Sequence, residues 1–246
     1  DIQVVENHVF LEDLPAAFDG FRLLQLSDLH IDMNEAIAHA IVGRVRGMDY
    51  DLCVLTGDYR FRTFGDIAGC LDGMRRLRGS LSSDVLAVLG NHDSIAMLPA
   101  LEDMGIRLLM NESTTVRRGD EHLYLAGIDD AHFFGAGNVG KALAGIPQGV
   151  PAILLSHTPE VYREAADAGA RLLLCGHTHG GQLCLPGGYP LTLDARIPRR
   201  LGRGAWEHAG MQGYTSRGTG ASVVGVRLNC PPEITVHLLH GTTARQ

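Results

Sequence analysis

Short apolar runs recur along the chain, and most of them end in a cluster of polar residues. Five such runs cover residues 21–26, 52–55, 85–89, 152–155 and 172–174. Short apolar runs bounded by glycine or polar turns are typical of strands that are buried on both faces. The pattern therefore predicts a set of core strands whose ends carry chemically capable side chains.

Apolar residues between these runs recur at helical spacing, which predicts helices that alternate with the strands. A third helical segment begins near residue 160 and ends at Gly169. Alternating strands and helices are typical of βαβ units, in which ligands gather at the carboxyl ends of the strands. The polar clusters are therefore expected along one edge of the sheet, at the carboxyl ends of its strands. The helix-spaced residues of the first two segments are Ile37, Ile41, Val45, Ile67, Leu71, Met74 and Leu77.

The pattern of apolar runs and turn residues changes after about residue 105. Short runs at 107–110, 114–117 and 122–126 suggest antiparallel pairing, and residues 234–239 predict a final strand. Residues 180–220 are rich in glycine and proline and predict a long irregular loop excursion. No repeat or linker divides the chain, so residues 1–246 are expected to form a single domain.

Composition narrows the class of protein. The 246 residues are 45% hydrophobic and 20% charged, which is a globular balance and excludes disorder. The net charge of −7 argues against non-specific binding of nucleic acid. No apolar run is long enough to span a bilayer. A cytoplasmic or membrane-peripheral location is favoured. Because the chain opens at Asp1 rather than Met, an exported form whose upstream signal was removed stays open.

The five cysteines show no C-x-x-C spacing, which argues against a cysteine zinc site and favours reduced, buried thiols. Cys175 and Cys184 are one pair that could close a loop in an oxidising compartment.

The residues at the strand ends form a ligand set for metal ions. Oxygen and imidazole ligands in this number suit two divalent metals, with one carboxylate bridging them. In extended backbone, residues two apart point the same way, so Asp28 and His30 converge, as do His177 and His179. The expected ligands are Asp28, His30, Asp58, Asn91, His157, His177 and His179.

Charge then points to phosphate chemistry. Two divalent cations with Asp28 and Asp58 leave about two positive charges at the centre, which attracts a phosphate anion. Such metals make a bridging hydroxide available as the nucleophile at neutral pH. His92 is the spare imidazole in the clusters and is expected to assist the leaving group, with Asp93 as a candidate to orient it.

Five short motifs around these residues, in their order along the chain, resemble those of the calcineurin-like metallophosphoesterases. The resemblance covers about residues 21–239 and implies a four-layer α-β-β-α sandwich of two mixed sheets, with a dinuclear metal site at the strand ends. It implies Asp28, His30 and His179 at the first metal, Asn91, His157 and His177 at the second, Asp58 as the bridge and His92 as the catalytic histidine. The motifs are Asp28-Leu29-His30, Gly57-Asp58, Gly90-Asn91-His92-Asp93, His157 and Gly176-His177-Thr178-His179.

Residues 176–182, 216–218 and 229–234 are similar to the bacterial YkuE/YaeI-like phosphodiesterase branch. This resemblance implies a phosphodiesterase or pyrophosphatase, with a nucleotide- or lipid-linked phosphate ester as substrate. A phosphomonoesterase or protein phosphatase is the alternative, and a non-catalytic scaffold is the third hypothesis. Mixed ligands admit Mn, Zn, Fe, Co or Ni, of which Mn or Zn is favoured. No obligate protein partner is expected.

Three further assignments stay open between a structural and a functional role. Arg217 either contacts substrate phosphate or forms an ion pair, and His132 is a candidate substrate contact. The arginines in residues 196–203 are either solvated loop charges or a contact for an anionic substrate or a membrane surface. These arginines are Arg196, Arg199, Arg200 and Arg203.

Overall fold

The computed structural model describes residues 1–147 and 149–241 and shows two six-stranded mixed sheets. The first sheet has the order β1 (Gln3–Leu11), β14 (Glu233–Gly241), β2 (Arg22–Leu26), β3 (Leu52–Thr56), β4 (Val85–Val88) and β5 (Ile106–Leu108). The second has the order β12 (Gly204–His208), β13 (Met211–Thr215), β9 (Leu172–Cys175), β8 (Ala152–Leu155), β7 (Glu121–Gly127) and β6 (Glu112–Arg118). A small hairpin joins β10 (Cys184–Leu185) to β11 (Tyr189–Pro190).

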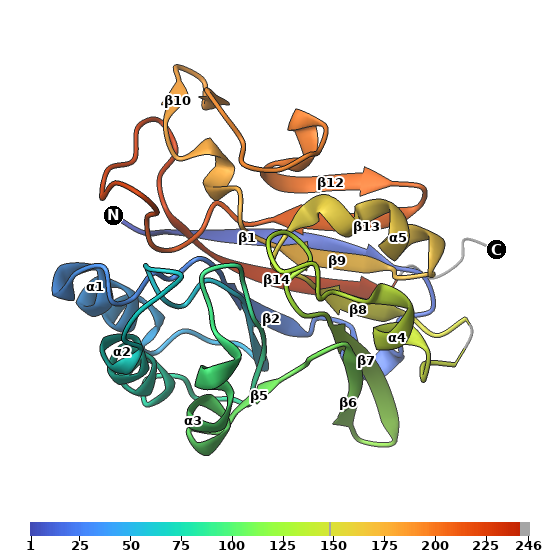
Figure 1. The fold of residues 1–246 in the computed structure, drawn as a ribbon. Helices are drawn as coiled ribbons and strands as arrows, with labels where there is room; N and C mark the ends of the chain where they lie inside the picture. Colours follow the sequence, from blue (N-terminus) through green and yellow to red (C-terminus); the bar gives the residue numbers. More distant parts are fainter. Residues whose placement is uncertain (148, 242–246) are drawn as a thin grey trace.

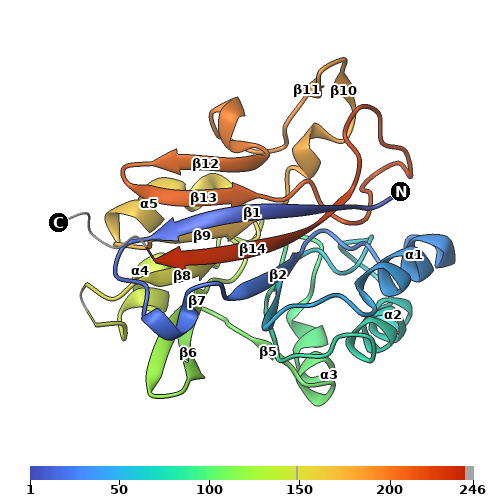
Figure 2. The ribbon, with the colours of Figure 1, turned by 180° about the vertical axis from the view of Figure 1, so that it is seen from behind.

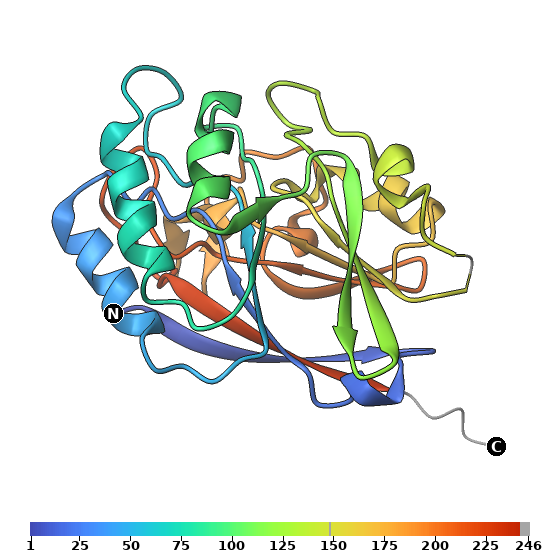
Figure 3. The same cartoon turned by 90° about the horizontal axis from the view of Figure 1, so that it is seen from below.

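Helices cover the outer face of each sheet, which completes four layers (Figures 1, 2 and 3). Three helices pack on the first sheet and two on the second. The first three are α1 (Glu35–Val45), α2 (Ala68–Arg78) and α3 (Leu98–Asp103), and the other two are α4 (Val139–Leu143) and α5 (Tyr162–Asp167). The expected α-β-β-α sandwich is therefore confirmed.

Successive side chains of the core strands enter different hydrophobic layers. In β8, Ile153 and Leu155 pack between the sheets, whereas Leu154 packs under α4 and α5. In β3, Val54 lies between the sheets and Leu55 faces the helices. Because both faces of these strands are buried, their sequences are continuously apolar rather than alternating, which explains the runs that predicted them.

Strand pairing agrees with part of the expectation for the second half of the chain. β6 and β7 are antiparallel, as expected, but β5 pairs in parallel with β4. Strand β1 was not expected, because an edge strand with several exposed residues lacks a continuous apolar run. It pairs in parallel with β14.

An irregular loop was expected over residues 180–220, and this expectation is wrong for the second half of that range. Residues 204–215 form the regular β12–β13 hairpin at the edge of the second sheet. Its turn contains Ala209 and Gly210, both with positive φ, and Gly213 allows the ring of Trp206 to lie against the backbone of β13. Glycine is needed at that close approach, so a glycine-rich sequence here indicates packing rather than disorder.

All five cysteines are buried free thiols. Cys175 Sγ lies 3.3 Å from Thr215 Oγ1, and Cys184 Sγ contacts the Gly180 carbonyl at 3.3 Å. The suggested Cys175–Cys184 pair is therefore not formed. Within residues 1–147 and 149–241, no helix is both long enough and apolar enough to cross a bilayer.

The buried ring of His237 predicts a pH dependence of stability. Burial lowers the pKa of His237 to about 3, and its Nε2 lies 2.9 Å from Gln25 Oε1. Because the ordinary pKa of 6.5 is restored on unfolding, this contribution is present above pH 6.5 and is lost as pH falls toward 3. Urea unfolding between pH 6.5 and 4.5 should show wild type losing up to about 1.4 kcal/mol per pH unit more than His237→Gln. Equal slopes would contradict this prediction.

Candidate metal centre

The ends of five strands, three from one sheet and two from the other, bring the predicted ligands to a shared edge of the sandwich. Asp28, Asp58 and Asn91 follow β2, β3 and β4, whereas His157 and His177 follow β8 and β9. Packing of the two sheets through their common apolar layer holds these loops against one another. The side chains meet although they come from positions 28 to 179 of the chain.

The first group joins Asp28, His30 and His179. Their ligand atoms all lie within 4.8 Å of one another, and all three residues are buried. His179 Nε2 is 3.3 Å from Asp28 Oδ1 and 3.2 Å from His30 Nε2. This spacing is suited to a cation between the three side chains.

The second group surrounds His157. Its Nε2 lies 3.0 Å from Asn91 Oδ1 and 3.2 Å from His177 Nδ1. Asp58 Oδ2 is 3.4 Å from His157 Nε2 and 3.7 Å from His30 Nε2, so this carboxylate lies between the two groups. A position between both groups is what a bridging carboxylate requires.

Backbone carbonyls fix which ring nitrogens face the centre. His30 and His157 contact the carbonyls of Arg60 and Thr56 through Nδ1, each at 2.8 Å, and His177 contacts the Asp194 carbonyl through Nε2. A carbonyl only accepts, so each contacting nitrogen carries the proton and the opposite nitrogen of the neutral ring presents a lone pair. These lone pairs face one another and the carboxylates. The donor set therefore fits divalent cations, which accept such ligands.

The pKa values of these side chains show that a positive charge is stabilised at the centre. Burial lowers the pKa of His157, but the adjacent Asp58 carboxylate outweighs burial and raises that pKa to about 10. Burial raises the pKa of Asp58, yet His157 and His30 hold it well below its usual range. Burial lowers the pKa of His177 to about 4. A buried anion thus recruits a proton onto one neighbouring ring, and a cation at this position would displace that proton.

The backbone of the centre is strained. Several of the predicted ligands have left-handed backbone angles, which non-glycine residues rarely adopt. Such conformations cost about 1–3 kcal/mol each and persist where surrounding structure enforces them. Gly57 adds a close approach, since a Cβ there would lie 2.7 Å from both Gly90 N and His157 Nδ1. The predicted ligands with these angles are Asp28 (φ 50°), His30 (φ 39°), Asp58 (φ 57°), His177 (φ 68°) and His179 (φ 51°).

His92 lies beside the centre, but its ring is not oriented by Asp93, the residue expected to do so. Its Nε2 is 4.0 Å from Asp58 Oδ2, and its Nδ1 is 2.8 Å from the Phe61 carbonyl. The expectation that Asp93 orients His92 is wrong, because adjacent residues in this turn point in different directions. The Phe61 carbonyl takes that place.

Asp93 is a buried backbone anchor. Oδ2 accepts from the amides of Asp58 and Gly90, at 2.8 and 2.9 Å. Oδ1 accepts from the amides of Tyr59 and Arg60, at 2.9 and 3.4 Å. The carboxylate thereby holds the turn that carries Asp58 against the turn that carries Asn91.

The two candidate substrate residues lie in different surroundings. The Arg217 guanidinium pairs with Glu233 and also contacts Gln3 Oε1 at 3.2 Å. The structure therefore has the ion pair, and a contact between Arg217 and a substrate phosphate stays a prediction. His132 lies by the centre, with its ring centroid 4.1 Å from that of His177 and its Nδ1 2.8 Å from Glu160 Oε2.

Two arginines near the ligands were missed by sequence reasoning. Arg227 Nη2 lies 3.0 Å from His179 Nδ1 and donates to the Arg217 carbonyl at 2.7 Å. Arg60 is almost fully buried and donates to carbonyls of the loop after Phe61, while its own carbonyl fixes His30. Arg60 follows the Gly57-Asp58 motif closely, which was an available signal, whereas Arg227 lies in a loop without one.

A four-layer α/β sandwich with histidine and carboxylate ligands at the joined strand ends defines a metal-dependent hydrolase. Residues 21–183 match the family model described as the calcineurin-like phosphoesterase superfamily domain. The chain therefore belongs to the calcineurin-like phosphoesterase superfamily, and the resemblance stated from its motifs is confirmed.

Curated relatives span most of the chain. It is 27% identical over 247 residues to the uncharacterized metallophosphoesterase YkoQ of Bacillus subtilis, covering 96% of this chain and 90% of that protein. It is 31% identical over 240 residues to the phosphodiesterase YaeI of Escherichia coli, covering 88% and 81%. It is 24% identical over 224 residues to the UDP-2,3-diacylglucosamine pyrophosphatase LpxG of Chlamydia muridarum, covering 70% and 67%.

Among solved structures, the NAD nucleotidase NadN of Haemophilus influenzae matches with a TM-score of 0.50. The match covers 81% of this chain and 45% of that one at 14% identity, which shows a shared fold.

The anchor formed by Asp93 predicts a measurable loss of stability. Asp93→Asn replaces one acceptor oxygen by an amide that faces backbone N–H groups, which leaves buried donors without partners. We expect a loss of about 3 kcal/mol in the free energy of unfolding, measured by urea titration. Asp72→Asn, on the exposed face of α2, is the matched control and should change stability by less than about 0.5 kcal/mol. A loss in Asp93→Asn no larger than in the control would refute the anchoring role.

Proposed function

We propose that this chain is a dinuclear metal-dependent phosphodiesterase or pyrophosphatase. The observation that carries the proposal is the convergence of histidine ring nitrogens and carboxylate oxygens, with Asp58 between two groups of candidate ligands and His92 beside them. The phosphodiesterase name of YaeI and the pyrophosphatase name of LpxG support a substrate in which phosphorus is doubly esterified or part of a pyrophosphate.

Each group of ligands would hold one cation. Asp28, His30 and His179 would hold the first, and Asn91, His157 and His177 would hold the second, with Asp58 shared between them. Divalent cations bound there, with Mn or Zn favoured, would supply a nucleophile at neutral pH and stabilise the charge that develops on the phosphoryl oxygens.

His92 is proposed to deliver the proton that the leaving oxygen needs. The Phe61 carbonyl fixes Nδ1, so Nε2 is the atom that exchanges a proton at the centre. Its side chain is 22% exposed, which lets Nε2 reach both substrate and solvent. Asp93 acts through the backbone as a positioning residue.

The rim of the centre supports a substrate with an apolar or aromatic portion. His132 lies tilted against the ring of His177 and is held by Glu160, which places it to contact a bound phosphate ester. The next two residues, Phe133 and Phe134, are 60% and 52% exposed. Exposed aromatic side chains beside a polar centre favour a nucleotide- or lipid-linked phosphate over inorganic pyrophosphate.

Removing the proton donor separates chemistry from metal binding. We expect His92→Asn to lower kcat for bis(p-nitrophenyl) phosphate by about 10²–10⁴-fold, because general acid catalysis contributes this much. Elemental analysis should still find two metal ions per chain. His39→Asn, an exposed histidine on α1, is the control and should retain full activity. Unchanged kcat in His92→Asn, after chelation and reconstitution with Mn²⁺, would contradict the assignment.

Asp58→Asn tests the shared ligand. Loss of the carboxylate between both groups should reduce the metal content below two ions per chain and abolish the rise in Tm that Mn²⁺ causes in wild type. Differential scanning calorimetry with and without Mn²⁺ measures both proteins. An equal shift in Tm for the variant and wild type would remove Asp58 from the ligand set.

The substrate class is tested by parallel assays of a diester, a nucleoside-diphosphate-linked pyrophosphate and a monoester. We expect kcat/KM to be at least about tenfold higher for the diester or the pyrophosphate, a difference of about 1.4 kcal/mol in transition-state stabilisation. Higher kcat/KM for p-nitrophenyl phosphate would instead support a phosphomonoesterase.

A further inference from the structure

Two segments beside the metal centre join to form one exposed apolar surface. One is the β10–β11 hairpin with the residue that follows it, and the other is the loop 221–229. Leu228 N donates to the Gln182 carbonyl at 3.0 Å, and Cys184 N donates to the Leu228 carbonyl at 2.9 Å. Figures 1 and 2 show both segments projecting from the same end of the sandwich. We name this surface the apolar tip, and its residues are Leu185, Tyr189, Leu191, Val223, Val224, Val226 and Leu228.

The tip is unusually exposed for its composition. Val223 is 83% exposed and Val226 is 60% exposed, and every member of the tip exposes at least 46% of its surface. Single exposed apolar residues are ordinary on a protein surface, but adjoining ones on two bonded segments mark an interaction site.

Basic residues border the tip in a chain that is acidic overall. Residues 182–203 contain four arginines and one carboxylate, and residues 221–229 contain no acidic residue, whereas the whole chain carries −7. Arg199 lies over the ring of Tyr189 at 5.1 Å and donates to the Pro190 carbonyl. Arg203 also donates to the hairpin, at the Gly188 carbonyl. Two of these four arginines are thus bonded to the hairpin that carries the apolar side chains.

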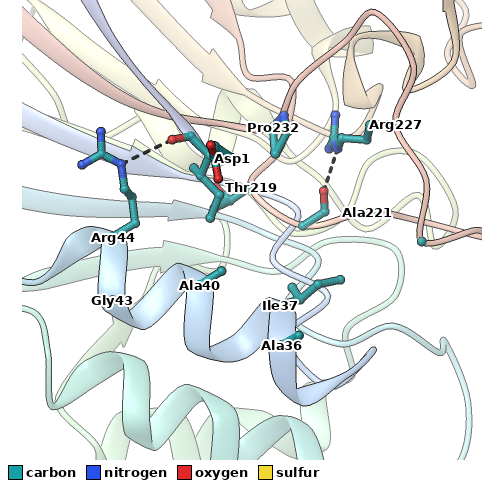
Figure 4. Close-up of a pocket in the computed structure, with 13 residues that line it drawn as sticks. Asp1, Ala36, Ile37, Ala40, Gly43, Arg44, Thr219, Ala221, Arg227 and Pro232 are labelled. Carbon is teal, nitrogen blue, oxygen red and sulfur yellow. Dashed lines mark hydrogen bonds between the residues drawn. The ribbon is translucent and has the colours of Figure 1, made fainter.

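A cavity of about 700 Å³ opens behind the same loop (Figure 4). Its walls come from one face of α1, including Ala36, Ile37 and Ala40, and from the 219–232 segment, including Ala221 and Gly225. Arg227 of the 221–229 loop also lines the cavity, so the loop presents small side chains and one positive charge to it.

We propose that the apolar tip docks the protein on a bilayer that contains anionic phospholipids. Leucine, valine and tyrosine side chains would enter the interface, and the neighbouring arginines would contact headgroup phosphates. The charge pattern favours this occupant, since a neutral apolar partner would not need arginines in an acidic chain. Because the tip continues directly from His179, docking would hold the metal centre beside the membrane surface. The proposal does not depend on the proposed hydrolysis, because binding is measured without substrate.

Vesicle co-sedimentation of the full chain tests the proposal. We expect wild type to bind vesicles of 70% phosphatidylcholine and 30% phosphatidylglycerol (about these fractions) at least tenfold more tightly than pure phosphatidylcholine, since each interfacial arginine contributes roughly fivefold. The triple variant Val223→Ser, Val224→Ser, Val226→Ser should lose at least about tenfold in binding while it retains hydrolysis of a soluble diester. Phe10→Ser, which removes an exposed apolar side chain on β1 outside the tip, is the matched control and should bind like wild type.

Other outcomes would overturn the proposal. Wild type that does not bind the anionic vesicles, or a triple variant that binds as well as wild type, would exclude membrane docking through the tip. Equal loss in Phe10→Ser would show that the loss is not specific to the tip and would overturn docking through it. Sedimentation velocity addresses a second copy as the occupant: a wild-type dimer that becomes a monomer in the triple variant would assign the tip to self-association instead.

Discussion

The structure is organised around a concentration of electron-pair donors in a buried space. Asp28, Asp58 and the inward nitrogens of several histidines lie 3–4 Å apart, so protons or cations have to lie between them. Such groups repel when they are left without a cation, and the repulsion is large where water is excluded. The centre is therefore stable only with positive charge in it, whether from a proton on His157 or from metal ions. This requirement explains why neutral ligand tautomers are fixed by backbone carbonyls that belong to the neighbouring loops.

Packing in the rest of the sandwich compensates for the backbone strain of the candidate ligands. Five strained ligand residues at about 1–3 kcal/mol each amount to roughly 5–15 kcal/mol, which equals the whole stability of an ordinary domain. The ligands can hold these conformations because three apolar layers fix the strands that precede them. Asp93 and Arg60 then fix the turns by direct bonds to backbone amides and carbonyls. Metal binding would offset part of the strain, because it replaces repulsion between ligands by coordination.

Sequence reasoning predicted the strands, and placed the candidate metal ligands at their ends, for a common physical reason. Buried strands must be continuously apolar, and a metal centre at their ends needs particular residue types in their final positions. Contacts made through a folded turn were not predictable in this way. Asp93 follows His92 directly yet faces the backbone of residues 58–60. Arg217 lies in the family-like segment 216–218 yet pairs with Glu233. Strand β1 and the β12–β13 hairpin were missed because edge strands expose polar residues and glycines that also occur in loops.

The apolar tip and the metal centre share the same pieces of chain, and this limits how each can move. His179 leads through a short 3-10 helix (His179–Gly181) into β10, and Arg227 in the 221–229 loop reaches back to the ring of His179. A force on the tip is therefore transmitted to a proposed metal ligand through one side chain and a few residues of backbone. Because buried strained ligands tolerate little displacement, the tip must be stiff where it meets the centre. The hydrogen bonds that join its two segments through Gln182, Cys184 and Leu228 supply that stiffness.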